Sequence, residues 1–381
     1  MNMFFIIFVL LTTLFMVINP QETVNAASAG IQLWYMVVLP ALLPFFIMSE
    51  LLINLGVIHL LGVMLEPIMR PLFKLPGSSS LVIAMGFTSG FPIGAVLTKK
   101  LYEQKLLTAD EAERLVSFTN NSSPLFILGA VGVGMFGYAP FGYLLAASHY
   151  ISNLIVGIIW GLKSGHTSKI SKQQSSLAIA AKQVFRNHIS IGKLLGDSIR
   201  NSINNIIAIA GFILLFCVVT RMLAIWGIMD QIALVIMKTT SFLGITYPQA
   251  YGLGMGIFEM TIGLKTLISS QGNLLTTLIA ASMLMGFSGF SIIAQVMSFM
   301  TGTPVRLSFY LLSRLVQIAL SASITMAGYY LFFAKKTVQS WSGLSHPAFY
   351  SFDAWSISVY CLILGLGIIA VMILISQFIK D

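Results

Sequence analysis

Apolar segments about as long as a lipid bilayer is thick recur along this chain, and they decide which solvent it folds in. Segments 32–54, 141–162 and 203–223 are each close to the ~20 residues that an α-helix needs to cross ~30 Å of hydrocarbon. Only 9% of the residues are charged, against roughly 25% in a soluble domain. The sequence therefore predicts an all-α polytopic membrane protein.

The remaining apolar segments extend this prediction. A cleaved signal peptide is one reading of the first segment, because Val24-Asn25-Ala26 resembles a cleavage site. No Lys or Arg precedes that segment, so we favour a retained helix followed by a polar spacer. Segment 57–75 is expected to be an interfacial helix with an ion pair between Glu66 and Arg70, four residues apart. The further spans are expected at 3–18, 231–246, 273–299, 306–333 and 355–379.

Positive charge is concentrated between two of the predicted spans. The stretch 163–193 carries several Lys and Arg residues and lacks Asp and Glu. An excess of basic residues in a loop between spans is typical of the cytoplasmic side of a membrane. Anionic lipid headgroups are a second partner for such a loop. The net charge of +9 therefore indicates orientation in membrane lipid, and no nucleic-acid partner is expected.

The inventory of catalytic groups is nearly empty. Both cysteines, Cys217 and Cys361, lie inside apolar runs, and no zinc-protease, phosphate-loop or nucleophile-elbow pattern occurs. We therefore expect no metal, no cofactor and no enzymatic activity. An intramembrane enzyme is the alternative, and it would need Glu50 or His149 to find partners that the sequence does not reveal.

Several of the apolar segments contain residues that break helices. Gly90-Phe-Pro-Ile-Gly94 predicts a bent or re-entrant segment within 79–98. Ser123 as N-cap and Pro124 in the first turn predict a half-helix over 125–136, and Thr108-Ala-Asp-Glu111 predicts a capping box. In the second half, glycines break 250–268, and Gly286-Phe-Ser-Gly289 interrupts 273–299.

These features recur in the same order in the two halves of the chain. A shift of 165 residues pairs Thr108 with Asn273, Ser123 with Ser288 and His149 with Arg314. Chance similarity between two apolar stretches is the alternative. With 163–193 cytoplasmic, we expect an inverted repeat, as in many transporters. The expected regions are 1–30 (membrane helix and spacer), 31–162 (first repeat), 163–200 (basic loop), 201–335 (second repeat) and 336–381 (C-terminal membrane helix).

The breaks predict where a solute would bind. In inverted-repeat transporters the discontinuous helices form the site near the bilayer midplane, and the N-termini of half-helices favour anions. We therefore expect a site at 88–94, 119–124, 259–263 and 286–291. The candidate substrate-binding residues within these segments are Ser89, Gly90, Asn120, Asn121, Ser122, Ser123 and Ser288.

Ionisable residues inside the predicted spans complete the site. An arginine within the hydrocarbon costs about 2.5–3.5 kcal/mol on insertion scales, so it faces a cavity or a partner. Tyr310, Arg314, Gln317 and Ser321 share one helix face. Arg314, with Gln317, is expected either to bind an anionic substrate or to pair with an acidic side chain.

Three further ionisable residues are candidates in the same region. His149, with Asn153 one turn away, either hydrogen-bonds a ligand or is a satisfied core residue. Glu50 and Glu259 are candidates for a coupling proton or Na⁺, or for the counter-charge of Arg314.

Four stretches of the first half carry a family resemblance. They are Leu39-Pro-Ala-Leu-Leu-Pro-Phe-Phe46, Thr88-Ser-Gly-Phe-Pro-Ile-Gly94, Leu107-Thr-Ala-Asp-Glu-Ala-Glu-Arg114 and Ser117-Phe-Thr-Asn-Asn-Ser-Ser-Pro-Leu-Phe-Ile-Leu-Gly129. Together they resemble the YlbJ-type sporulation integral membrane proteins, which carry a nucleoside recognition or Gate domain. The resemblance covers most of residues 30–335.

The resemblance implies a function that the residues alone do not give. Membership in the stage V sporulation protein V group implies transport of a small anionic solute, dipicolinate, across the outer forespore membrane of a sporulating bacterium. The domain's kinship implies the alternative of a permease for a nucleoside or another small polar solute. A passive channel and a membrane scaffold that uses 163–193 as its contact surface are further alternatives. Expected protein partners are a second copy or another sporulation membrane protein.

Overall fold

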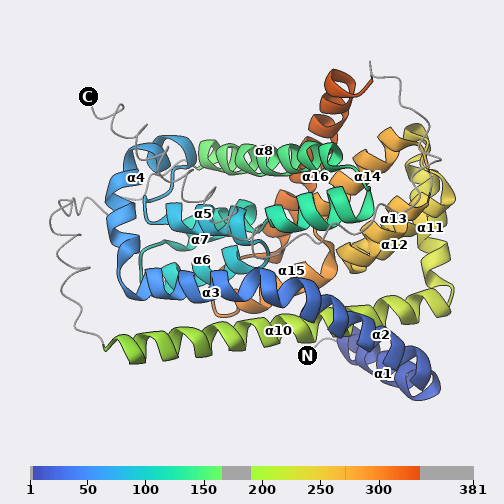
Figure 1. Cartoon of the computed structure of the whole chain (residues 1–381), viewed down its shortest axis with the longest axis horizontal. Helices are drawn as coiled ribbons and strands as arrows, with labels where there is room; N and C mark the ends of the chain where they lie inside the picture. Colours follow the sequence, from blue (N-terminus) through green and yellow to red (C-terminus); the bar gives the residue numbers. More distant parts are fainter. Residues whose placement is uncertain (1–2, 165–189, 271, 335–381) are drawn as a thin grey trace.

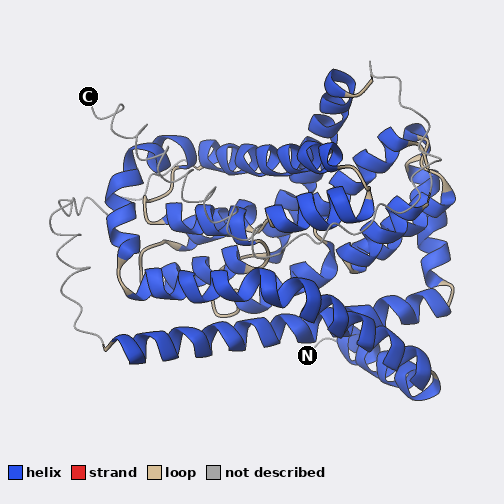
Figure 2. Cartoon of the chain, in the orientation of Figure 1, coloured by secondary structure: helices blue, strands red, loops and turns tan. Residues whose placement is uncertain are grey.

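The computed structural model describes residues 3–164, 190–270 and 272–334, and every regular element in these ranges is a helix (Figures 1 and 2). The prediction of an all-α fold is confirmed. The first half contains α1 (Met3–Ile18), α2 (Pro20–Leu33), η1 (Trp34–Val38), α3 (Leu39–Asn54), α4 (Val57–Phe73), α5 (Ser79–Ser89), α6 (Ile93–Glu103), α7 (Ala109–Thr119), η2 (Leu125–Met135) and α8 (Ala139–Lys163). The second half contains α10 (Ile191–Ile225), α11 (Ile228–Thr239), η3 (Ser241–Leu243), α12 (Tyr247–Phe258), α13 (Met260–Ser269), α14 (Leu274–Phe287), α15 (Gly289–Phe299) and α16 (Leu307–Phe332).

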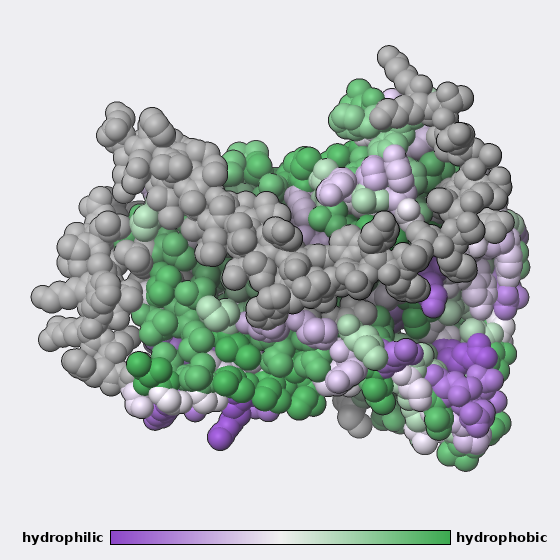
Figure 3. Space-filling model, viewed as in Figure 1, coloured by the Kyte–Doolittle hydropathy of each residue, from purple (hydrophilic) through white to green (hydrophobic). Residues whose placement is uncertain are grey.

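Within the described ranges, four helical segments are long and apolar enough to cross a membrane. They are Ala139–Lys163, Ile191–Ile225, Leu274–Phe299 and Leu307–Phe332. The third consists of α14 and α15 and is broken at Ser288. A fifth span is counted if Phe5–Ile18 and Pro20–Met36, bent by 108° at Asn19, are taken together. Figure 3 shows a largely apolar face over α3 and α10, as contact with lipid requires.

Three boundaries differ from the sequence-based prediction. The expected span at 231–246 is wrong, because α11 ends at Thr239 after 12 residues, about 18 Å of helix. The expected polar spacer after Asn19 is instead the helix α2, which continues through the π-helix η1 into α3. The expected span at 32–54 is consequently not one straight helix. Of the expected basic loop at 163–193, residues 165–189 lie outside the described residues, and α10 already begins at Ile191. The expected helix at 355–379 also lies outside the described residues.

The predicted caps and ion pair are present. Thr108 and Glu111 form the capping box of α7, and the Ser123 hydroxyl accepts a hydrogen bond from the Phe126 amide at 3.2 Å. The Arg70 guanidinium donates to the Glu66 carboxylate, whose other oxygen accepts from the Gly77 amide. Local sequence therefore decides where these helices begin.

The centre of the molecule is a bundle of α7, α8, α14 and α16. The helix α8 packs on α16, α7 contacts α16, and α14 contacts both α8 and α16. At the periphery of the bundle, Arg306 donates two hydrogen bonds from its guanidinium to Glu113 of α7, at 2.9 and 2.6 Å. Hydrogen bonding to Glu113 raises the pKa of Arg306 above its ordinary value, so this link between the two halves stays ionised.

The two halves share their order of elements. Each has a helix that ends at a glycine with positive φ (Gly56 or Gly227), then a short amphipathic helix, a broken helix pair, a second break and a long helix. The contacts between the halves are reciprocal, since α7 of the first half contacts α16 of the second and α14 of the second half contacts α8 of the first. The inversion of one half relative to the other stays a prediction.

Candidate solute-binding cavity

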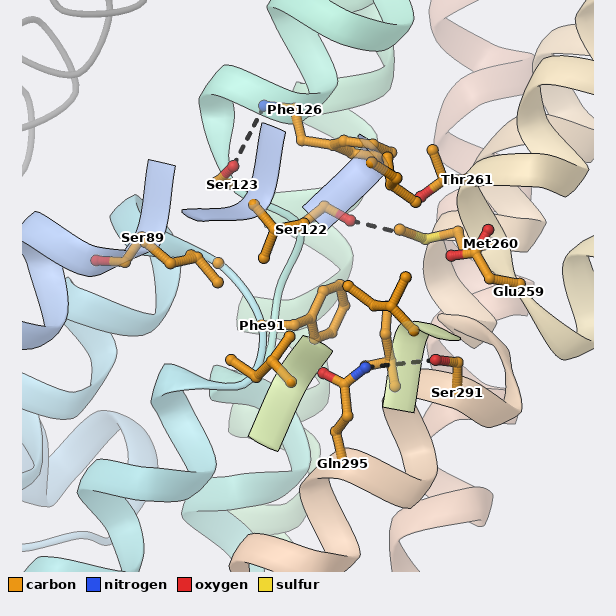
Figure 4. A pocket seen from close by; sticks show the side chains of 17 residues that line it. Ser89, Phe91, Ser122, Ser123, Phe126, Glu259, Met260, Thr261, Ser291 and Gln295 are labelled. Atoms are coloured by element: carbon orange, nitrogen blue, oxygen red, sulfur yellow. Dashed lines mark hydrogen bonds between the residues drawn. The ribbon is translucent and has the colours of Figure 1, made fainter. Parts of the chain in front are cut away.

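A cavity of about 100 Å³ lies where the four helix breaks meet. Figure 4 shows Ser89, Ser122, Glu259 and Ser291, one from each break region, around the same space. Helices α3 and α10 close the cavity with apolar side chains, including Leu42 and Ile209. The polar lining consists of Ser89, Ser122, Ser123, Glu259, Thr261, Ser291 and Gln295.

The first break is fitted closely against the segment that follows α7. Gly90 has φ +95° and ψ −176°, a region that only glycine adopts readily. A Cβ atom at Gly90 would lie 2.9 Å from both the amide nitrogen and the Cβ of Ser123. The Asn120 side chain accepts a hydrogen bond from the Ala95 amide at 3.0 Å, in the first turn of α6. The two broken segments of the first half therefore hold each other in place.

The breaks of the second half are built in a similar way. Glu259 separates α12 from α13, and its carboxylate accepts a hydrogen bond from the Ile262 amide at 2.7 Å. Ser288 and Gly289 both have positive φ between α14 and α15. A Cβ atom at Gly289 would lie 2.9 Å from the Gly256 carbonyl oxygen. This close backbone approach places the start of α15 against the break of α12 and α13.

The electrostatics of the cavity combine helix ends with one carboxylate. The half-helices η2, α13 and α15 begin at its lining, and helix N-termini carry partial positive charge. The first turn of α15 has no capping side chain. Glu259 is the one ionisable side chain of the lining and is 4% exposed. The Ser89 hydroxyl is buried without a partner in the described structure, and Figure 4 shows it pointing away from the other polar residues of the lining.

Arg314 lies behind the cavity, at the end of α7. Its guanidinium donates to the Ser117 carbonyl, to the Asn120 carbonyl at 3.3 Å and to the Asn153 side-chain oxygen at 3.4 Å. Carbonyl groups at a helix C-terminus carry partial negative charge and lack partners within the helix. The fully buried Arg314 is therefore compensated by the backbone at the first-half break and clamps that break to α16.

The counter-charge role expected of the two buried glutamates is wrong for Arg314. Glu50 pairs with Lys100 of α6 instead, and Glu259 caps α13. Among the described residues, no carboxylate lies within ion-pair distance of Arg314. This outcome could not be predicted from sequence, because the partners of Arg314 include backbone carbonyls.

His149 is held in one protonation state by its neighbours. Its Nε2 accepts a hydrogen bond from the Ser122 amide at 3.1 Å, so this nitrogen carries no proton. Its Nδ1 lies 3.4 Å from the Gln317 side-chain amide. A neutral imidazole has one acceptor nitrogen, so Nδ1 bears the proton, and the Gln317 amide turned by 180° from its recorded orientation, in which its nitrogen faces Nδ1, would accept that proton with its oxygen. That orientation also provides a partner for this oxygen, which otherwise has none among the described residues.

The structure thus divides the predicted site residues into four groups. Ser89, Gly90, Ser122, Ser123 and Glu259 line the cavity. A second group lies behind the lining in a buried polar cluster, and Ser288 forms the bend between α14 and α15. Glu50 lines a different cavity. The members of the buried polar cluster are Asn120, Asn121, His149, Asn153, Arg314 and Gln317.

Sequence reasoning missed part of the lining. Gln295 lies one turn after Ser291 on α15, and its amide donates to the Ser291 hydroxyl at 3.4 Å. The i, i+4 spacing of these two polar residues in an apolar helix was the available signal. Phe126 and the apolar residues of α10 carry no such signal, because they resemble any lipid-facing side chain. The described residues hold no cluster of His, Cys, Asp or Glu that would bind a metal ion.

These features define a class of protein: a helical integral membrane protein whose broken helices surround a small, largely apolar cavity with a few polar groups. Residues 35–139, which include the first-half breaks, match the family described as nucleoside recognition, or Gate. No solved structure matches the chain.

Comparison with known proteins then gives the family. The chain is 38% identical to the sporulation integral membrane protein YlbJ of Bacillus subtilis over 328 residues, 84% of this chain and 80% of that protein. It therefore belongs to the YlbJ family of sporulation integral membrane proteins. It is also 25% identical to an uncharacterized protein of Alkalihalophilus pseudofirmus over 182 residues, 46% of this chain and 37% of that protein.

Proposed function

We propose that this chain is a transporter that moves a small polar solute across a membrane of a sporulating bacterium through the cavity at the four breaks. The observation that carries the proposal is the meeting of Ser89, Ser122, Glu259 and Ser291 around one space. Discontinuous helices with a midplane site are the architecture of many secondary transporters. Rocking of one half against the other would expose the site to each side in turn.

Dipicolinate in the outer forespore membrane is the leading candidate for substrate and location. Three half-helix N-termini favour its carboxylates, and hydroxyl groups of the lining provide donors. The Glu259 carboxylate opposes a dianion, so we propose that Glu259 carries a proton when the solute binds. The lining holds no basic side chain, and the buried Arg314 acts only indirectly, by holding the carbonyls of Ser117 and Asn120 that precede Ser122.

A nucleoside is the second candidate, and two observations favour it. The matched family is described as nucleoside recognition. Phe91 and Phe126 flank uncharged hydroxyl and amide groups in the lining, an arrangement that suits an aromatic base and a sugar. A membrane scaffold, the candidate from another class, would need none of these groups.

Uptake into proteoliposomes tests the proposal. Wild-type protein in phosphatidylcholine vesicles is expected to take up radiolabelled dipicolinate saturably, whereas protein-free vesicles do not. Saturable uptake of uridine without uptake of dipicolinate would select the second candidate. If neither solute enters vesicles that contain folded protein, the transporter proposal is contradicted and the scaffold becomes the leading account.

The proton on Glu259 leads to a pH prediction. Between about pH 6 and 8 an ordinary carboxylic acid stays ionised, so dipicolinate remains a dianion throughout. Protonation of Glu259 removes its negative charge from the lining, and uptake by the wild type should therefore rise as the pH falls. Glu259→Gln mimics the protonated side chain and should show uptake independent of pH.

A surface carboxylate supplies the control for this prediction. Glu22 pairs with Arg221 at a partly exposed position away from the cavity, so Glu22→Gln should keep the wild-type pH profile. An unchanged pH dependence in Glu259→Gln would show that another group binds the proton.

A further inference from the structure

A second cavity of about 340 Å³ is walled by the same helices as the first. Helices α3, α10 and α15 line both cavities, and the α5–α6 pair lines the first through its break and the second through α6. On α15, Gln295 lines the central cavity and Ser298 the second one. On α10, Ile209 lines the central cavity and Asn205 the second one. Three or four helical residues span about 5 Å, so the cavities are neighbours.

The direction of the four helices shows that the cavities lie end to end. Along α3 and α15, the residues that line the second cavity follow those that line the first, and the Ser89–Phe91 break that lines the first precedes the α6 residues that line the second. Along α10 the order is reversed. The two cavities therefore lie one after the other along these helices. Figure 1 shows α3 and α10 side by side, with α6 next to α3.

The helix turns between the two parts are apolar. Phe46 of α3 and Ile206 of α10 are each 1% exposed, and both belong to one buried cluster with Val96 of α6. The two cavities are therefore separated by packed side chains here.

The second cavity has a different chemistry from the first. Asn201, Asn204 and Asn205 of α10 share one helix face by their spacing and line the cavity. Opposite them, the Lys100 ammonium donates to the Glu50 carboxylate and bridges α6 to α3. Amide and charged groups are costly in contact with lipid, so these side chains suit a hydrated space. Glu50 is 3% exposed and the Lys100 side chain 25% exposed, so the lysine is the partner that a solute reaches first.

We propose that the second cavity is a vestibule that binds a small carboxylate solute on its way to the central cavity. The solute's carboxylate replaces Glu50 on the Lys100 ammonium, while the asparagine amides of α10 donate to its remaining oxygens. Separation of Glu50 from Lys100 frees α6 from α3 and lets the apolar turns move apart. The binding step is a property of the vestibule, and the onward passage rests on the proposed transport function.

Thiol labelling at the vestibule tests the binding step. Asn204→Cys is placed in a background with Cys217→Ala and Cys361→Ala, reconstituted in phosphatidylcholine vesicles, which contain no anionic headgroup. Ile203→Cys, an exposed neighbour outside the lining, is the matched control. A charged, membrane-impermeant methanethiosulfonate should label Asn204→Cys about tenfold faster than Ile203→Cys, because only a hydrated thiol forms the reactive thiolate.

Protection from labelling identifies the ligand. Millimolar dipicolinate should slow the labelling of Asn204→Cys, and uridine should not. Addition of Lys100→Gln should abolish the protection, while labelling of Asn204→Cys stays about tenfold faster than that of Ile203→Cys, a contrast that an unfolded chain would lose. Equal labelling of the two cysteines, or labelling that no carboxylate slows, would overturn the vestibule proposal.

Blocking the labelled thiol separates this proposal from the transport function. A bulky maleimide on Asn204→Cys should stop dipicolinate uptake, and the same treatment of Ile203→Cys should leave it unchanged. Undiminished uptake after the block would place the path elsewhere. If the wild type transports nothing while dipicolinate still protects Asn204→Cys, the transport function fails and the vestibule's binding of a carboxylate stands.

Discussion

Replacement of Arg314 by methionine is expected to destabilise the folded protein by about 3–5 kcal/mol, because three buried acceptors lose their donor. The guanidinium binds the carbonyls of Ser117 and Asn120 and the side chain of Asn153. Each buried acceptor left without a donor costs about 1–3 kcal/mol. Thermal unfolding in detergent measures the effect as a large fall in Tm, together with loss of uptake.

A second arginine variant supplies the control for this structural role. Arg200 is exposed on α10, and Arg200→Met should melt like the wild type. The alternative is that Arg314 holds the substrate directly and has no structural role. Arg314→Met would then keep the wild-type Tm and lose only affinity for the solute, and that result would contradict the structural role.

Gly90→Ala is expected to cause the second large effect. Its backbone region strains any other residue by about 1–3 kcal/mol, and the new Cβ would press on Ser123 at 2.9 Å. The strain therefore falls on the contact between the first-half breaks at the cavity. We expect a lower Tm and an uptake rate reduced by about tenfold or more, in line with ~1.4 kcal/mol per factor of ten.

Gly302 provides the matched control for this substitution. It also has a positive φ, +84°, but a Cβ atom there would meet nothing within 4 Å. Gly302→Ala should therefore cost only the conformational term of about 1–2 kcal/mol and leave uptake per folded molecule unchanged. Equal loss of uptake in the two variants would show that the contact with Ser123 is irrelevant to transport.

The helix breaks could be predicted from sequence because their causes are local. Gly90 with Pro92, Ser123 with Pro124, and Asn273 as a cap each act within a few residues. The break between α14 and α15 needs only the positive φ angles of Ser288 and Gly289. The error at α11 has the same origin, since hydropathy continues past Thr239 while Thr240, Ser241 and Gly244 end the helix.

The partners of the buried polar residues could not be predicted in the same way. The stripe of Tyr310, Arg314 and Gln317 was visible in the sequence, but the partners of Arg314 include carbonyl groups about 195 residues earlier in the chain. A backbone carbonyl left free by a broken helix has no residue type and so leaves no sequence signal. The pairing of Glu50 with Lys100 likewise depends on how α3 and α6 pack.

Transport as proposed requires that the solute passes through the cavity at the four breaks. Ser291→Leu tests it most directly, because a leucine side chain on α15 would occupy that space, and leucine is compatible with a helix. Ser323→Leu, at an exposed position of α16, is the control for an added apolar side chain. At matched amounts of folded protein, Ser291→Leu should lose dipicolinate uptake and Ser323→Leu should keep it. Wild-type uptake by Ser291→Leu would show that the solute does not pass through this cavity.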